Sequence, residues 1–260
     1  MITRERLIEE FTLLDKKATL LASREVIPEE LVLYLIGGGN LALRGIKAAT
    51  ADVDVVVEDL HVLRALEEVL INPSPELRIE GRYIVYVKEV EHEYKAKLGA
   101  FSVYKKLDPQ MGDFNFDVFV RRVLRGITLS EGMKTRAMIP EEFTDFKTIR
   151  IYLVSLEDIF LFKGVTSLGR SKDIDDLLRL IEHGVNFDII LAELEVQKAL
   201  LEKERFEWLM GILYEKALRL REILQKEGLR SKGLNKFIKN LGTYFVRNQQ
   251  LPEVGDEEYL

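Results

Sequence analysis

Residues 36–58 read IGGGNLALRGIKAATADVDVVVE and join a run of three glycines to two aspartates that are one residue apart. The apolar stretch Leu31–Ile36 predicts a buried strand, Gly37–Gly39 a turn, and Asn40–Gly45 the first turns of a helix. Glycines let a backbone approach a phosphate, and the N–H groups of such a turn, together with the positive end of the helix that follows, attract an anion. The stretch therefore predicts an anion site at a strand-to-helix turn.

The two aspartates, Asp52 and Asp54, begin a run of β-branched residues that predicts a strand over Asp52–Val57. Residues i and i+2 of a strand point to the same face, so the two carboxylates lie side by side. They repel each other unless a cation or a shared proton lies between them. Mg²⁺ prefers oxygen ligands and is usually bound by one or two carboxylates together with substrate phosphates. The pattern predicts a nucleoside triphosphate (NTP) held on Mg²⁺ or Mn²⁺.

This combination resembles the nucleotidyltransferase superfamily with the DNA polymerase beta-like fold, whose signature is a Gly-Gly or Gly-Ser turn, a short helix and Asp-x-Asp. The alternating strand Phe114–Val120 carries Asp117, which matches the third carboxylate of that family. Residues 154–177, VSLEDIFLFKGVTSLGRSKDIDDL, resemble the toxin-type branch related to AbiEii. The resemblance extends over roughly residues 30 to 185.

The fold that we expect from these patterns is an α/β (α+β) nucleotidyltransferase core with a mixed sheet and flanking helices over residues 1–150, followed by a helical domain over residues 151–260. The resemblance implies transfer of a nucleoside monophosphate from an NTP to a hydroxyl of a tRNA end or a protein, with a cognate antitoxin as a partner. It assigns catalysis and metal binding to Asp52, Asp54 and Asp117. The implied nucleotide-binding residues are Gly37, Gly38, Asn40, Arg44, Lys47 and Lys163.

Two positions depart from the family pattern. Gly38 stands where many relatives have a serine, which leaves only backbone donors for a phosphate at that position. Ala49 stands where close relatives often have an arginine, and Arg44 and Lys47 are near enough in sequence to supply that charge. A different class of function fits the same fold, namely a catalytically inactive binding or antitoxin-like protein.

Charged residues near Lys163 have a structural interpretation. Asp173 and Asp176 follow it at helical spacing, and we expect one of them to be its ion-pair partner. Arg170 and Lys172 belong to the same mixed-charge segment, which is also typical of an ordinary helix surface.

The composition narrows the class of protein. Of the 260 residues, 47% are hydrophobic and 32% charged, which is typical of an ordinary globular protein. The absence of cysteine excludes disulfides, zinc–thiolate sites and cysteine nucleophiles, and together with abundant charge it resembles the composition of thermophilic proteins. No apolar run is long enough to span a bilayer and no signal-peptide pattern begins the sequence, so we expect a cytoplasmic location and no membrane partner.

Charge is distributed unevenly along the chain. The segment Lys216–Arg247 contains nine basic and two acidic residues, a net charge of +7 in a chain whose total is −6. Such a segment could bind RNA, although a solvated helix face is the commoner explanation of a short basic run.

Further elements are predicted from periodicity and capping residues. Helices are expected over residues 3–22, with Thr3 as the cap, over 58–70, after the cap Ser155, and from Asn186 onward with breaks near Gly228 and Gly233. Strands are expected at Tyr83–Val87, Ala100–Tyr104, Phe114–Val120 and Ile149–Val154, with a loop at Asp108–Gly112 before the third of these.

Overall fold

A computed structural model describes residues 1–72, 78–79, 82–83, 85–89, 101–107, 112–123, 126–166 and 171–248. The chain divides into two compact units. The first unit contains Met1–Arg125 and Lys134–Val154, and the second contains Gly126–Met133 and Ser155–Leu260. The domain boundary predicted at residue 150 falls inside a strand that belongs to the first unit.

The first unit is built on a mixed sheet of six strands in the order β10-β2-β4-β9-β8-β7. β10 is parallel to β2 and β4 is parallel to β9, whereas the other neighbouring strands are antiparallel. The strands of this sheet are β2 (Leu31–Ile36), β4 (Asp52–Val57), β7 (Val87–Lys88), β8 (Ser102–Lys106), β9 (Phe114–Val120) and β10 (Ile149–Leu153).

Short strands and helices complete this unit. Two pairs of two-residue strands lie outside the main sheet: β1 (Ile2–Thr3) with β3 (Ala49–Thr50), and β5 (Arg78–Ile79) with β6 (Arg82–Tyr83). The helices are α1 (Arg4–Ala22), α2 (Gly37–Leu43), α3 (Leu60–Ile71) and a 3-10 helix at Glu141–Phe143. α5 (Glu131–Arg136) includes the point at which the chain passes back into this unit.

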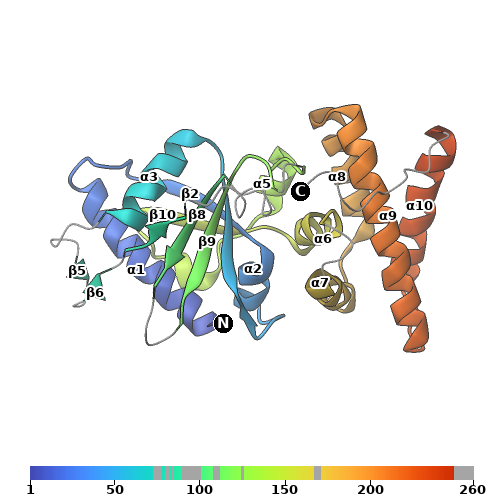
Figure 1. Cartoon of the computed structure of the whole chain (residues 1–260), viewed down its shortest axis with the longest axis horizontal. Helices are drawn as coiled ribbons and strands as arrows, with labels where there is room; N and C mark the ends of the chain where they lie inside the picture. Colours follow the sequence, from blue (N-terminus) through green and yellow to red (C-terminus); the bar gives the residue numbers. More distant parts are fainter. Residues whose placement is uncertain are drawn as a thin grey trace. The chain divides into compact units, whose positions relative to one another are not determined.

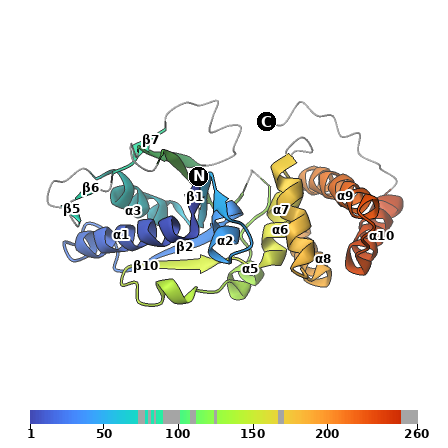
Figure 2. The ribbon, with the colours of Figure 1, turned by 90° about the horizontal axis from the view of Figure 1, so that it is seen from below.

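The sheet has an apolar face and a carboxylate face. Val53, Val55 and Val57 alternate along β4 and join the hydrophobic core. The helices α1 and α3 pack against the strands of this sheet (Figures 1 and 2). Phe11 of α1 packs edge-on against Phe116 of β9, with ring centroids 6.2 Å apart. Because side chains alternate along a strand, the neighbour of Phe116, which is Asp117, points to the opposite face.

The second unit is helical. Its helices are α6 (Leu156–Gly164), α7 (Ser171–Glu182), α8 (Phe187–Leu200), α9 (Lys203–Lys226) and α10 (Lys232–Asn248), of which α9 and α10 lie side by side (Figures 1 and 2). Rings of Phe160, Phe187 and Phe237 contact one another in its core, with centroids 5.1–6.2 Å apart. Gln197 of α8 hydrogen-bonds to both the N–H and the C=O of Thr128, which ties the segment 126–133 to these helices.

Several sequence predictions are confirmed. The strands at Leu31–Ile36, Asp52–Val57 and Phe114–Val120 have the predicted bounds. Thr3 caps α1 by accepting a hydrogen bond from the backbone N–H of Arg6, and Ser155 caps α6 in the same way through Asp158. A mixed α/β unit and C-terminal helices are therefore present. The described helices include none that is both long and apolar enough to cross a membrane.

One strand prediction was wrong and another differs in its bounds. No single strand covers Tyr83–Val87, because the N–H of Tyr86 bonds to the carbonyl of Leu70 and its hydroxyl donates to Glu10 at 2.6 Å. The strand predicted at Ala100–Tyr104 is present over Ser102–Lys106, where pairing with β9 extends it to two lysines, and Ala100 itself lies outside the described residues.

One helix boundary differs from prediction. α2 begins at Gly37 instead of Asn40, and the side chain of Asn40 hydrogen-bonds back to the carbonyl of Leu35 at the end of the preceding strand. The predicted break near Gly228 and Gly233 is confirmed, because Gly228 has a φ of 74° and α10 begins at Lys232, next to Gly233. The predicted loop residues 108–111 and Arg170 are outside the described residues.

Asp15 of α1 connects this helix to the edge of the sheet. Its Oδ1 accepts hydrogen bonds from the N–H groups of Thr148 and Ile149 at 2.9 and 2.8 Å, and its Oδ2 accepts one from Lys147 at 3.0 Å. Three backbone donors bonded to one buried carboxylate position the start of β10.

We predict that Asp15→Ala lowers the free energy of unfolding by about 2–3 kcal/mol, because it leaves three backbone donors without their acceptor. Urea unfolding of the purified protein measures this, with the exposed Glu29→Ala as control. A loss no larger than that of the control would show that Asp15 does not hold β10.

Candidate functional site

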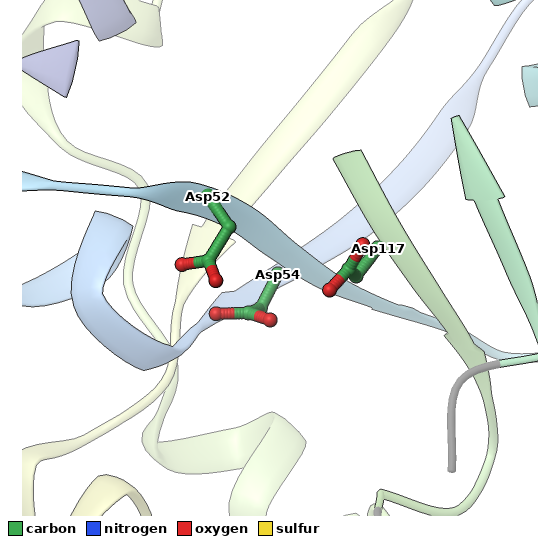
Figure 3. A group of neighbouring side chains, drawn as sticks. All are labelled: Asp52, Asp54 and Asp117. Atoms are coloured by element: carbon green, nitrogen blue, oxygen red, sulfur yellow. The ribbon is translucent and has the colours of Figure 1, made fainter. Parts of the chain in front are cut away.

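Three carboxylates converge at the centre of the sheet. Asp52 and Asp54 lie on β4, and the parallel register pairs Asp54 with Asp117 of β9. Oxygen atoms of the three residues lie within 4.8 Å of one another. Figure 3 shows the three side chains directed toward a common space on one face of the sheet. The same-face geometry predicted for Asp52 and Asp54 is confirmed, and strand pairing adds Asp117 to them.

Burial and charge make this cluster unfavourable without a cation. Asp117 is 1% exposed, and its Oδ1 accepts no hydrogen bond from any described residue. The pKa of Asp117 is raised from 3.8 to about 7. Burial is the larger cause of this rise, and the nearby charge of Asp52 is the smaller one. A buried carboxylate oxygen without a donor, facing two further carboxylates, fits a divalent cation with oxygen ligands. The three carboxylates can therefore hold a metal ion, and which ion they hold stays a prediction.

The glycine turn and the carboxylates form one structural unit. Gly37 has a φ of 63°, and a Cβ at this position would lie 2.1 Å from Oδ2 of Asp54. Only glycine therefore satisfies both the backbone conformation and the space that Asp54 leaves. The contact places the turn directly beside the cluster of carboxylates, which the sequence spacing alone could not establish.

Gly38 is close to two side chains that can bind an anion. A Cβ on Gly38 would lie 2.3 Å from the hydroxyl oxygen of Thr50 and 3.7 Å from the ammonium nitrogen of Lys47. The Thr50 hydroxyl also donates to Asp52 at 3.4 Å. Lys47, which was expected to replace the arginine missing at position 49, is thus next to the turn, whereas Thr50 was not among the predicted residues. The spacing of Thr50, Asp52 and Asp54 at i, i+2 and i+4 was the available signal.

Two predicted nucleotide-binding residues contact the protein backbone. Asn40 is fully buried, and its Nδ2 donates to the carbonyls of Leu35 and Val154 at 2.8 and 3.1 Å. Arg44 donates to Oδ1 of Asn40 at 2.9 Å and to the carbonyl of Val154 at 3.1 Å. These bonds join α2 to the ends of β2 and β10. Their role in nucleotide binding stays a prediction.

Lys163, the remaining predicted nucleotide-binding residue, belongs to the second unit. Its ammonium pairs with Asp173 at 3.1 Å and with Asp176 at 2.8 Å, so it contacts both candidates where one partner was expected. Burial by itself would lower the pKa of Lys163, but the charges and hydrogen bonds of the two aspartates raise it. Lys216, also buried, donates to the carbonyl of Lys163 at 2.8 Å. In this structure Lys163 is part of a buried polar cluster.

The sequence was compared with known proteins. No protein-family model and no curated protein matches it. The assignment of the candidate site therefore rests on the geometry of its residues alone.

We predict that Asp117→Asn stabilises the metal-free protein at high pH. The folded-state pKa of Asp117 lies above its ordinary value, so this group destabilises the fold as pH rises above about 4, and the loss reaches its full size above about pH 7. The variant should gain on the order of 2 kcal/mol near pH 8 and much less near pH 5, as measured by urea unfolding with a chelator present. A gain that does not change with pH would contradict this assignment.

We predict that Lys163→Met lowers the free energy of unfolding by about 3 kcal/mol, because it leaves Asp173 and Asp176 buried without their cation. The control is Lys172→Met, an exposed lysine at the start of α7. Equal stability of the two variants in urea would exclude a structural role for Lys163.

Proposed function

We propose that the chain is a Mg²⁺-dependent nucleotidyltransferase of the DNA polymerase beta-like superfamily, close to its toxin-type branch. It transfers a nucleoside monophosphate from an NTP to a hydroxyl acceptor. The observation that carries this proposal is the convergence of Asp52, Asp54 and Asp117, with one buried Asp117 oxygen left without a donor. The glycine turn beside Asp54, with Lys47 close to it, supports a triphosphate as the group bound there.

The residues have separate tasks in the proposed reaction. Asp52, Asp54 and Asp117 would hold the cation, which would supply positive charge to offset the negative charge of the phosphates. The acceptor oxygen attacks the α-phosphorus, and the bond from this phosphorus to the oxygen that bridges it to the β-phosphorus breaks, so pyrophosphate leaves. Asp117 is the proposed acceptor of the proton that leaves the acceptor hydroxyl.

A nucleic acid such as a tRNA end is the acceptor that the distribution of charge favours. The basic segment Lys216–Arg247 is partly internal, because Lys216 is buried. Other residues of this segment line a cavity of about 160 Å³ where α9 connects to α10, and among them are Arg221, Arg230 and Ser231. Guanidinium and hydroxyl donors around such a cavity fit a phosphate of an RNA backbone.

We predict that an NTP with Mg²⁺ or Mn²⁺ raises the melting temperature of the protein and that Asp52→Asn/Asp54→Asn abolishes the effect. At a ligand concentration of about 100 times Kd, mass action gives roughly 2.7 kcal/mol of stabilisation. Each NTP is tested by thermal unfolding with and without metal, and the exposed Asp145→Asn is the matched control.

Transfer itself is tested by incubating the protein with each α-³²P-labelled NTP, Mg²⁺ and either total tRNA or cell lysate. We expect label in RNA or in protein with the wild-type chain and none with the double variant. Metal-dependent NTP binding without transfer to any acceptor would instead support a catalytically inactive binding protein. An equal thermal shift in the double variant would reject the proposed metal site.

A further inference from the structure

The carboxylate face carries a second row of polar side chains beside the three aspartates. The register aligns Asp54 with Asp117 across β4 and β9, and Asp52 with Asn115. On the next strand, β8, Lys105 is directly opposite Asn115. Directly paired residues of neighbouring strands point to the same face. Asp52, Asn115 and Lys105 therefore form one row on the face that carries the metal ligands.

The two sides of the cluster differ in chemistry. On one side, Ile36 of β2 pairs with Asp54, and the glycine turn follows immediately with Lys47 near it. On the other side lie β9 and β8, with Asp117 and then Lys105. If the triphosphate occupies the glycine side, as proposed above, the acceptor hydroxyl reaches Asp117 from the side of β8. Lys105 is then the cation beside the acceptor.

Lys105 is able to exchange its present partner for a ligand. Its side chain is 44% exposed and lies 3.5 Å from the carboxylate of Asp113, which is 45% exposed. Exposed ion pairs of this kind contribute little to stability, so a phosphate can replace Asp113 at low cost. The adjacent Lys106 points to the opposite face, where it forms a largely buried ion pair with Glu10. Of these two lysines, only Lys105 serves the carboxylate face.

We propose that Lys105, with Asn115 beside it, binds a backbone phosphate of a polynucleotide acceptor whose hydroxyl lies at Asp117. The inference rests on the proposed function and names the residues that hold its polynucleotide acceptor. Lys105 is a diagonal neighbour of Asp117 across β8 and β9, and such neighbours lie ~7–8 Å apart. This spacing is comparable to that between a sugar hydroxyl and a neighbouring phosphate of a nucleic acid. A protein hydroxyl has no phosphate at that position.

The test measures RNA binding as a function of salt. The probe is a fluorescent single-stranded oligoribonucleotide with a free 3′-hydroxyl, titrated with the full chain by anisotropy at several KCl concentrations in Mg²⁺. Lys105→Gln should weaken binding about fivefold and reduce the slope of log K against log salt by about 0.7, the value for one phosphate contact on a single strand. Lys105→Arg should retain both.

The matched control is Lys147→Gln, which removes the same charge from another exposed lysine. Lys147 lies just before β10, two residues ahead of Ile149, which pairs with the first residue of β2. Lys105→Gln and Lys147→Gln with equal affinities and slopes would overturn the inference. NTP-dependent stabilisation is measured in parallel. If it is present while the wild-type chain binds no RNA at low salt, the inference fails and the proposed function stands with a protein acceptor. If the stabilisation is absent, both fail.

Discussion

The pairing of β4 with β9 forces like charges together, and the rest of the first unit depends on that constraint. Carboxylate oxygens within 4.8 Å of one another repel by a few kcal/mol per pair at the effective dielectric of a protein surface. The opposite face of the same strands offsets this cost, because Val53, Val55 and Phe116 are almost fully buried in the core. One sheet therefore supplies stability on one face and a cluster of three carboxylates that can hold a cation on the other.

The constraint extends to the glycine turn. Asp54 occupies the space that a side chain at position 37 would need, and Thr50 occupies the space beside Gly38. The two glycines are thus required by the side chains of the site as well as by any phosphate that approaches the turn. Neither the turn nor the carboxylate strand can change alone. Acidic groups that are held away from water in this way reduce local stability, and such groups cluster at functional sites.

The sequence predicted the elements whose patterns are local. β2, β4 and β9 were predicted with their bounds because apolar, β-branched or alternating residues define them, and the three aspartates follow from their places on β4 and β9. Features that depend on contacts distant in sequence were missed. The hydroxyl of Tyr86 bonds to Glu10, 76 residues away, and removes its segment from the expected strand. In the sequence, Asp173 and Asp176 were equivalent candidates for the partner of Lys163. Only the packing of α6 against α7 shows that Lys163 contacts both.

The central claim is that Asp52, Asp54 and Asp117 together hold a divalent cation for an NTP. Crystals grown with Mn²⁺ and a non-hydrolysable NTP analogue test it most directly, because Mn²⁺ is located by its anomalous scattering. The account predicts an anomalous peak bonded to oxygens of all three aspartates and to the analogue's phosphates, with the phosphates beside Gly37 and Lys47. The claim would be contradicted if the analogue were bound at full occupancy elsewhere on the protein and no anomalous peak lay between the three aspartates.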